Sequence, residues 1–445
     1  MTGPVPTTTS QDSSHRNAEA AYGVSFHSMT SLSAALVLLA VGVLVQAYSG
    51  SSAFDYERLS KREVPGQAQV IDWKSFNVLP TVSPPSVANA TTFFFIPPGH
   101  DLESLKEKPF HIYDDEFYDV IGPNPTLTLI ANAGTNPIFH EAPVWYPPTD
   151  EMFFVQNAGA AAAGTGLNKS NIILKIALSE AATVSNIRNA TGSVNVQTVD
   201  VPAIINSNGG TNYKGEIVFA AEGQGDDATS QLVVMNPREP YNTTILLNNY
   251  FGRQFNSLND AAVNPRNKEL YFSDSLYGYL QNFRPAPGLR TQIYRYNPET
   301  GAVAAVADGF GVNNGLTFSP NGSHAYVTDT GANKAVLGWN FSEPASIYRF
   351  DVQEDGTWDN RRLFAYADTG VPDGIHCDSN GNVYSGCGDG VQVWNPSGKL
   401  IGKIFLGKTA ANFNFAGDGR MVILAEEDLY YATLGASGGG YIEDV

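Results

Sequence analysis

The chain has 445 residues, enough for two or three ordinary domains or for one large all-β domain. Its 43 Gly, 26 Pro, 21 Tyr and 24 Phe against only 5 Met are typical of many strands separated by turns. The formal net charge of -18 excludes a protein that binds nucleic acid through its phosphates, because such binding needs an excess of Lys and Arg.

Residues 1–62 are predicted to lie outside the fold. Residues 32–45 (LSAALVLLAVGVLV) form an apolar run followed by Gln46-Ala47, typical of the core and cleavage site of a secretory signal and short for a membrane span. Only Arg16 precedes the run as a firm positive charge, so translation from Met29 or an uncleaved signal anchor are open alternatives. We expect a secreted protein, with membrane contact only in the case of an anchor.

A dibasic pair, Lys61-Arg62, follows the apolar run and resembles a site for removal of a propeptide, although a chance pair is the alternative. Secretion would make the chain a glycoprotein if its Asn-x-Ser/Thr sequences are used. These sequences begin at Asn89, Asn168, Asn189, Asn242, Asn321 and Asn340.

Six segments downstream are predicted to be strand–turn–strand hairpins. In chain order they begin at Glu141, Tyr213, Asn259, Asn314, Asp373 and Asn412. The copies at Asn259 and Asn314 superpose best, with a proline 6, a tyrosine 12 and an aspartate 15 positions after the asparagine. Such self-similarity at a regular step is the signature of a repeat architecture.

Further extended runs lie between the hairpins, so each unit has about four strands in about 40 to 60 residues, the period of a β-propeller blade. One blade cannot bury both faces of its sheet, and blades therefore stack around an axis. The sequence predicts an all-β fold, a six-bladed β-propeller of four-stranded antiparallel blades around a central tunnel. Residues 63–445 are expected to form this single catalytic domain, with residues 63 to about 130 giving a lead-in and part of one blade.

The only two cysteines, Cys377 and Cys387, flank the hairpin that begins at Asp373. With a turn centred on Asn380-Gly381, Cys377 is expected opposite Tyr384, and Cys387 on the other face of the ribbon. Two cysteines exclude a disulfide scaffold and a thiolate metal site, and we favour two buried thiols over one disulfide.

Four of the hairpins begin with a side-chain oxygen donor: Glu141, Asn259, Asn314 and Asp373. The innermost strand of each blade runs along the tunnel, so these side chains are expected to converge at one mouth. Two carboxylates and two amide oxygens suit calcium or magnesium and disfavour zinc or copper, and calcium fits best because it accepts six to eight oxygens in loose geometry. Asn and Asp are also ordinary turn formers, but Glu141 is not, and it precedes an apolar strand.

Other catalytic patterns are weak. Gly435-Ala-Ser-Gly-Gly matches the Gly-x-Ser-x-Gly motif but lies in a glycine-rich tail with no strand-to-helix elbow. The seven histidines show no zinc spacing. His140 and His376 lie one and three residues from proposed ligands, so either is a candidate for the tunnel mouth and for substrate contact, with a packed or solvated histidine as the alternative.

Four signatures resemble the gluconolactonase/regucalcin family of calcium-dependent six-bladed propellers: His140-EAPVW, Leu258-NDAAVNP, Asn313-NGLTFSPNG and Val371-PDGIHCDSNGNVY. Further stretches, such as Phe110-HIYDDEFYDVIG, Asn249-YFGRQFNSLND and Gly386-CGDGVQVWNPSGKLIGKI, are similar to the fungal lactonohydrolases that open aldonolactones and pantolactone. The resemblance runs from about Gln67 onward.

The resemblance implies that Glu141, Asn259, Asn314 and Asp373 hold the metal. The chain departs from animal gluconolactonases at one point, because Ser257 stands where their Arg-x-Asn-Asp signature has an arginine that meets sugar hydroxyls. Sugar recognition therefore cannot be carried over at that position, although Ser257 remains a candidate for substrate contact.

The expected function is a calcium-dependent lactonohydrolase that opens aldonolactones or pantolactone. The calcium polarises the carbonyl and Asp373 acts as general base for a water or as nucleophile. A phosphotriesterase and a non-catalytic protein-binding propeller are the alternatives. A second, structural calcium, the natural lactone, its enantiomer and the oligomeric state stay open.

Overall fold

The computed structural model describes residues 62–84, 94–187 and 192–440. The part from Glu63 onward forms one compact unit. The predicted signal or anchor run, the alternative start at Met29, Lys61 and the acceptors Asn89 and Asn189 lie outside the described residues. No helix of the described part is long and apolar enough to cross a membrane.

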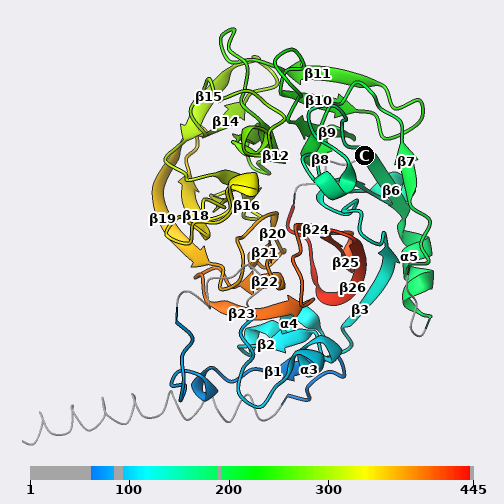
Figure 1. Ribbon diagram of the computed structural model, residues 1–445, viewed down its shortest axis with the longest axis vertical. Coiled ribbons are helices and arrows are strands. Elements are labelled where there is room, and N and C mark those ends of the chain that lie inside the picture. The colour runs from blue at the N-terminus through cyan, green and yellow to red at the C-terminus, as the bar shows by residue number, and fades with distance from the viewer. Residues whose placement is uncertain (1–61, 85–93, 188–191, 441–445) are drawn as a thin grey trace, which may run out of the picture. The chain divides into compact units, whose positions relative to one another are not determined.

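Six antiparallel blades surround a central axis, as predicted (Figure 1). Blade 1 contains β4 (Glu141–Tyr146), β5 (Glu151–Val155), β6 (Ile173–Ala177) and β7 (Gln197–Val199). Blade 2 contains β8 (Ser207–Tyr213), β9 (Glu216–Ala221), β10 (Gln231–Met235) and β11 (Thr243–Leu247). Blade 3 contains β12 (Leu258–Val263), β13 (Leu270–Asp274), β14 (Gln292–Tyr296) and β15 (Val303–Ala307).

Blade 4 contains β16 (Asn313–Phe318), β17 (His324–Asp329), β18 (Ser346–Val352) and β19 (Trp358–Tyr366). Blade 5 contains β20 (Ile375–Cys377), β21 (Val383–Cys387), β22 (Gly390–Trp394) and β23 (Leu400–Phe405). Blade 6 contains β24 (Asn412–Phe415), β25 (Asp418–Ala425), β26 (Asp428–Ser437) and β3 (Thr126–Asn132). Five of the six predicted hairpins are the inner strand pair of a blade, whereas the copy predicted to begin at Tyr213 starts at the last residue of β8 and contains only β9 of its pair.

The lead-in completes one blade and extends another, where the sequence predicted part of one blade. Strand β3 pairs antiparallel with β26, so an early strand supplies the outer edge of the last blade and ties the two ends of the ring together. Strand β2 (Phe110–Ile112) pairs with β23, and β1 (Ala68–Val70) pairs parallel with β2, which extends blade 5.

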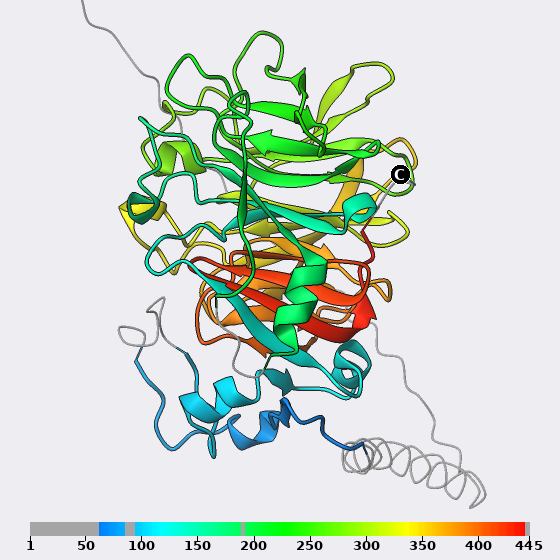
Figure 2. The same cartoon turned by 90° about the vertical axis from the view of Figure 1, so that its right-hand side faces the viewer.

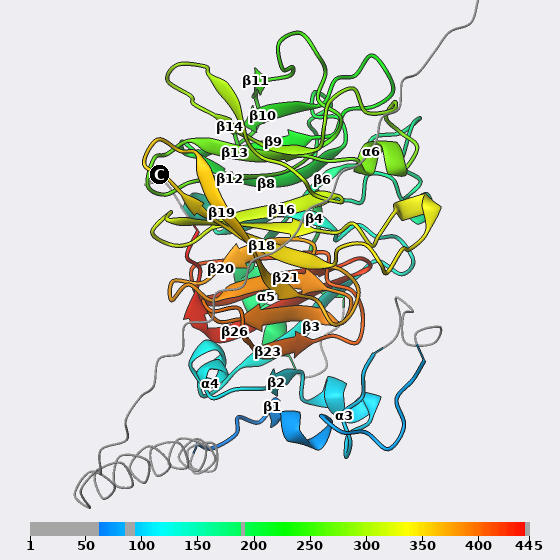
Figure 3. The ribbon, with the colours of Figure 1, turned by 90° about the vertical axis from the view of Figure 1, so that its left-hand side faces the viewer.

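The helices of the described residues are short and lie outside the sheets. They are α3 (Leu102–Glu107), α4 (Glu116–Ile121), α5 (Leu178–Ser185), α6 (Tyr277–Leu280) and the 3-10 turns η1 (Trp73–Ser75), η2 (Pro147–Thr149), η3 (Ala161–Ala163) and η4 (Ala335–Leu337). Helix α5 runs along the outside of the ring and contacts β3 and β6 (Figure 2). Helix α6 and the yellow turn η4 project from the same face (Figure 3).

The core lies between the blades. The second strands β13 and β21 are buried at every residue, because neighbouring blades cover both faces of each sheet. The outer strands β11 and β15 are only partly covered. Phe117 of α4 is fully buried among residues of blades 5 and 6, so the lead-in is part of the same core.

The register of the cysteine hairpin differs from the prediction by one residue. Cys377 pairs with Val383, and His376 faces Tyr384. The reason is the turn: the Asp378 carboxylate accepts the backbone N–H groups of Asn380 and Asn382, both at 2.9 Å, and so organises a three-residue loop instead of a two-residue one. Both thiols are buried and free, as favoured from the sequence.

Candidate active site at one mouth of the tunnel

The four predicted metal ligands come together. Glu141 begins β4, Asn259 and Asn314 are the second residues of β12 and β16, and Asp373 lies two residues before β20. All four line one cavity of about 280 Å³, together with His140. Residues of α6 and of the segment around η4 line the same cavity, which places it at the mouth that faces the viewer in Figure 1.

Bulges turn the inner strands at this mouth. The pairing of β4 with β5 slips between Glu141 and Val144, that of β12 with β13 between Leu258 and Ala261, and that of β16 with β17 between Asn313 and Leu316. A bulge places two residues of one strand opposite one of its partner and re-aims their side chains. The residues aimed in this way include Asn259 and Asn314.

Glycines directly after two of the predicted ligands allow neighbouring blades to approach closely. A Cβ atom on Gly315 would lie 2.5 Å from the carbonyl oxygen of Asp373, and one on Gly374 would lie 2.2 Å from Cγ of Asn412. Neither contact is possible for a larger residue without movement. Gly374 of the Pro-Asp-Gly sequence therefore makes room for a side chain of blade 6.

That side chain holds the first predicted ligand in place. Asn412 Nδ2 donates a hydrogen bond of 2.7 Å to Glu141 Oε2, and Asn412 Oδ1 accepts the N–H of Phe413 at 2.8 Å. Asn412 therefore has one donor committed to the candidate ligand and its acceptor committed to its own backbone. It orients Glu141 across the junction of blades 6 and 1.

The donor set fits a hard cation. Asn259 Oδ1 and Asp373 Oδ1 are buried and accept no hydrogen bond within the described structure. A buried acceptor without a partner costs roughly 1–3 kcal/mol, which a bound cation would offset. Together with Glu141 and Asn314 these atoms give two charged and two neutral oxygen donors, the type of set that calcium accepts.

The electrostatics of the site point the same way. Burial raises the pKa of Asp373 to about 6, against the opposing charge of His140. Burial and the neighbouring Asp373 charge raise the pKa of Glu141 well above its usual range. A positive charge close to two such carboxylates would stabilise the ionised form of both. No group of three His, Cys, Asp or Glu side chains in the described residues is arranged as a metal site, consistent with a set in which two ligands are amides.

His140 is held by a residue that the sequence did not point to. Its Nδ1 lies 3.1 Å from both carboxylate oxygens of Glu426, and both residues line the cavity. Burial disfavours the charged imidazole, but the Glu426 carboxylate outweighs it and raises the pKa of His140 to about 10. The pairing leaves Nε2 as the ring nitrogen available to a substrate.

Ser257 does not face the cavity. It is fully buried, and its hydroxyl donates to Glu222 Oε1 at 2.6 Å. The hydroxyl oxygen of Ser257 also accepts the N–H of Gly278 at 3.0 Å. Both functions of the hydroxyl are used inside the protein. The structure therefore corrects the expectation that Ser257 meets the substrate.

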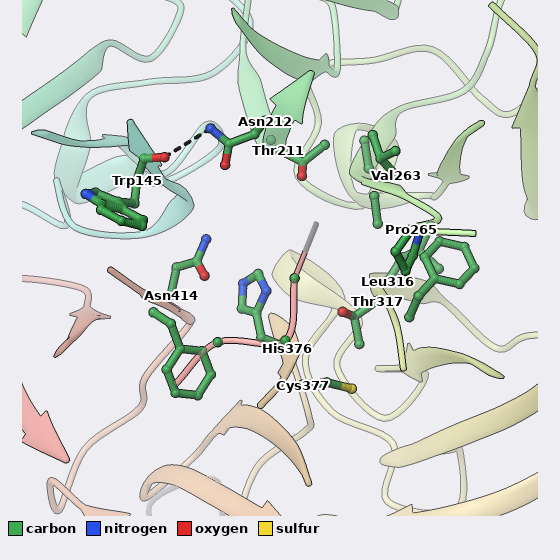
Figure 4. A pocket seen from close by; sticks show the side chains of 18 of the residues that line it. Trp145, Thr211, Asn212, Val263, Pro265, Leu316, Thr317, His376, Cys377 and Asn414 are labelled. Atoms are coloured by element: carbon green, nitrogen blue, oxygen red, sulfur yellow. Dashed lines mark hydrogen bonds between the residues drawn. The ribbon is translucent and has the colours of Figure 1, made fainter. Parts of the chain in front are cut away.

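His376 belongs to a different cavity. It lines a space of about 240 Å³ at the other end of the inner strands, where its ring points inward beside Asn414, Thr211 and Thr317 (Figure 4). The reason is distance along the strand, because three residues of extended chain after Asp373 cover roughly 10 Å. The expectation that His376 reaches the mouth with the predicted ligands is therefore wrong.

The second cavity contains the carboxylates of Asp260 and Asp418. Asp260 is already committed, because its two oxygens accept the backbone N–H groups of Ala261 and Leu316, both at 2.8 Å. The second, structural calcium therefore stays a prediction without support from this cavity.

One further oxygen donor was missed although the sequence carried its signal. Asn208 lines the first cavity from blade 2. Asn208-Gly209 repeats the Asn314-Gly315 pattern, and the pairing of β8 slips between Ser207 and Gly210 as the inner pairs of blades 1, 3 and 4 do. The hairpin prediction began this copy at Tyr213, at the end of β8, and so passed over its start.

Comparisons with known proteins agree with this architecture. A family model described as the SMP-30/Gluconolactonase/LRE-like region matches residues 140–425. Lactonohydrolase oryL of Aspergillus oryzae is 28% identical over 67% of this chain and 67% of its own length. Lactonohydrolase oryH of the same fungus is 26% identical over 74% of this chain and 81% of its own length.

Solved structures show the same fold. A gluconolactonase of Xanthomonas campestris superposes with a TM-score of 0.56 at 23% identity, over 73% of this chain and 94% of that one. The family match begins at His140, directly before β4, and ends with β25, so it covers the inner strands of all six blades. The chain belongs to the SMP-30/gluconolactonase/LRE-like family.

Proposed function

We propose that this protein is a calcium-dependent hydrolase that opens lactones to hydroxy acids. The observation that carries the proposal is the convergence of Glu141, Asn259, Asn314 and Asp373 in one cavity, with two of their oxygens buried and unpartnered. The relatives named lactonohydrolase and gluconolactonase support the reaction class.

The four side chains would hold the ion, with Glu141 and Asp373 balancing its charge. Calcium bound there supplies a positive charge that polarises the carbonyl oxygen of a lactone. Asn412 keeps the Glu141 carboxylate in position, and Glu426 keeps the imidazole of His140 at the cavity wall. The fixed arrangement means that little reorganisation is needed when the substrate binds.

Asp373 is the residue proposed to start the reaction. As general base it takes a proton from a water whose oxygen attacks the carbonyl carbon; as nucleophile it attacks that carbon itself, and a water then cleaves the acyl bond. In both routes the ring C–O bond breaks, one water is consumed, and the ring oxygen leaves as a hydroxyl after gaining a proton. We propose that His140, which lines the cavity, donates that proton from Nε2.

A single-turnover reaction in ¹⁸O water distinguishes direct attack by water from a covalent route in which water then attacks the Asp373 carboxyl carbon. Direct attack by water labels the product carboxylate and leaves Asp373 unlabelled. A covalent route with hydrolysis at the Asp373 acyl carbon puts the label into Asp373, which peptide mass spectrometry detects.

The test of the function is pH-stat hydrolysis of a lactone panel with calcium, with chelator and with calcium restored. The expected result is activity that chelator removes and calcium restores, and that Asp373→Ala lacks. A phosphotriester in the same panel examines the alternative reaction. Lactone opening that survives both the chelator and Asp373→Ala would refute the proposal.

Secretion is proposed alongside the activity, with residues 1–62 removed after Arg62 and residues 63–445 as the mature catalytic domain. The asparagines of the four glycosylation sequences within the described residues, Asn168, Asn242, Asn321 and Asn340, are exposed, as acceptors must be. N-terminal sequencing and deglycosylation of protein from the culture medium test this. A cell-bound protein that begins before residue 62 would contradict it.

A further inference from the structure

Exposed apolar side chains gather in two segments that border the candidate active site. Val336, Leu337, Trp339 and Phe341 lie within six residues of one loop, and Tyr279 of α6 adds a fifth side chain; we call these five the apolar rim. Leu337 is 72% exposed and Val336 59%. Single exposed apolar residues are ordinary, but such a group in one segment marks a binding surface.

The rim continues into the cavity. Ala335 and Trp339 line the cavity itself, and α6, which contacts η4, lines it through Tyr277. The rings of Trp339 and Phe341 stack with centroids 5.5 Å apart, so apolar contact surface continues from the cavity-lining Trp339 to Phe341. A molecule whose reactive end lies among the predicted ligands would lay its remaining part on this surface.

The loop that carries the rim is held in shape by its backbone. Lys334 N donates to Gly338 O, and Asn340 N donates to Ala332 O, both at 2.8 Å. The apolar side chains are therefore presented by an ordered loop with its own hydrogen bonds. A preformed apolar surface binds without a large ordering cost.

The position at which animal gluconolactonases have an arginine offers no group to a sugar in this chain. Ser257 is fully buried and fully hydrogen-bonded to Glu222 and Gly278, so no group from that position reaches the cavity. A polyhydroxylated substituent would also have to lie against the indole and the aliphatic side chains of the rim, where its hydroxyls would lose water without gaining partners.

We propose that the natural substrate is a lactone with an apolar alkyl or aryl substituent, and that this substituent binds to the apolar rim while the ring occupies the cavity. The inference rests on the proposed lactone hydrolysis and names its substrate class.

The experiment measures kcat/KM for δ-lactones with no, two-, four- and six-carbon alkyl substituents, and for glucono-δ-lactone. Each methylene that reaches the rim is expected to raise kcat/KM about fourfold, the equivalent of about 0.8 kcal/mol. Leu337→Ser is expected to lower the ratio of kcat/KM for the hexyl-substituted lactone to kcat/KM for the unsubstituted lactone about tenfold, because contact with one to two methylenes is lost. Trp339→Ala should act in the same direction.

Leu363→Ser is the matched control, because Leu363 is 63% exposed on the outer strand β19 of blade 4. It should leave every rate and the chain-length dependence unchanged. The proposal is overturned if glucono-δ-lactone is the best substrate, if kcat/KM does not depend on chain length, or if Leu337→Ser and Trp339→Ala change all lactones by one common factor.

Failure of the lactonase assignment gives a different result, because no lactone of any class would then be opened. Calorimetric binding of hexyl-substituted hydroxy acid, with the unsubstituted acid as reference, then examines the rim independently. The role of the rim would be overturned if the two acids bound with equal affinity, or if Leu337→Ser lowered the affinity for both acids by the same factor.

Discussion

The contact between Gly374 and Asn412 gives the sharpest test of how the site is built. A Cβ atom introduced by Gly374→Ala would lie 2.2 Å from both Cγ and Oδ1 of Asn412 and 2.5 Å from its Nδ2. All three atoms belong to one side chain, so Asn412 must rotate away. Its 2.7 Å hydrogen bond to Glu141 is then lost.

The two consequences differ in size. Overpacking of a tight contact costs roughly 1–3 kcal/mol of folding stability, and rotation of one side chain places this case at the lower end. Loss of a residue that orients a metal ligand lowers metal affinity about 10–100-fold. Gly374→Ala is therefore expected to weaken calcium binding more than it weakens the fold.

The assay is calorimetric titration of the metal-free protein with calcium, with urea unfolding in chelator for stability. Asn412→Ala should lower calcium affinity by a similar factor. The double variant Gly374→Ala/Asn412→Ala should be no worse than Asn412→Ala alone, because the three atoms that lie nearest to the new methyl are then absent. Gly288→Ala is the control, since a Cβ there has nothing within 4 Å.

If the losses of calcium affinity caused by Gly374→Ala and Asn412→Ala were strictly additive in the double variant, the proposed path from Gly374 through Asn412 to Glu141 would be refuted. The same path would be refuted by a Gly374→Ala protein that is strongly destabilised yet binds calcium as the wild type does. Absence of calcium binding by the wild-type protein would instead refute the metal assignment.

Three further predictions concern the fold. In Gly402→Ala the new Cβ would lie 2.2 Å from the ring of the buried Phe117, so we expect the free energy of unfolding in urea to fall by about 1–3 kcal/mol. A stability equal to that of the Gly288→Ala control would show that α4 is not fixed on blade 5. Lys403 Nζ lies 2.7 Å from Asp389 Oδ2, and both side chains are 5% exposed, so Lys403→Met should cost about 3–5 kcal/mol by leaving a buried charge unpaired. Burial already holds the pKa of Asp389 above its usual range, and loss of Lys403 raises this pKa further. The folded variant then binds a proton more readily than the unfolded chain, so the loss of folding stability caused by Lys403→Met should shrink as pH falls. An equal loss of stability at pH 8 and pH 5 would contradict this. Burial also raises the pKa of both Cys377 and Cys387, so neither thiol should react with a thiol reagent in native protein, while two should react in urea; fewer than two in urea without reductant would indicate a disulfide.

The repeat in the sequence determined the architecture. Proline, tyrosine and aspartate at fixed distances after Asn259 and Asn314 predicted matching hairpins, and these are the inner pairs β12–β13 and β16–β17. The same repeat predicted that oxygen-bearing strand starts gather at one mouth, since equivalent positions of blades around an axis lie at equal height. Local patterns were enough because a blade is a local structure.

Only the tertiary structure decided which side chains meet between blades. Asn412 and Glu141 are 271 residues apart, and Glu426 and His140 are 286 apart, yet each pair is in hydrogen-bond contact. Their contacts arise where the last blade packs on the first, a junction made by the pairing of β3 with β26.

The structure also separated residues that the sequence placed together. His376 follows Asp373 by three positions but faces the opposite cavity, and Ser257 precedes Asn259 by two but is buried against Glu222. Sequence spacing determines position along a strand and alternation of faces. It does not determine which neighbouring blade covers a given face, because that depends on the packing of segments far apart in the chain.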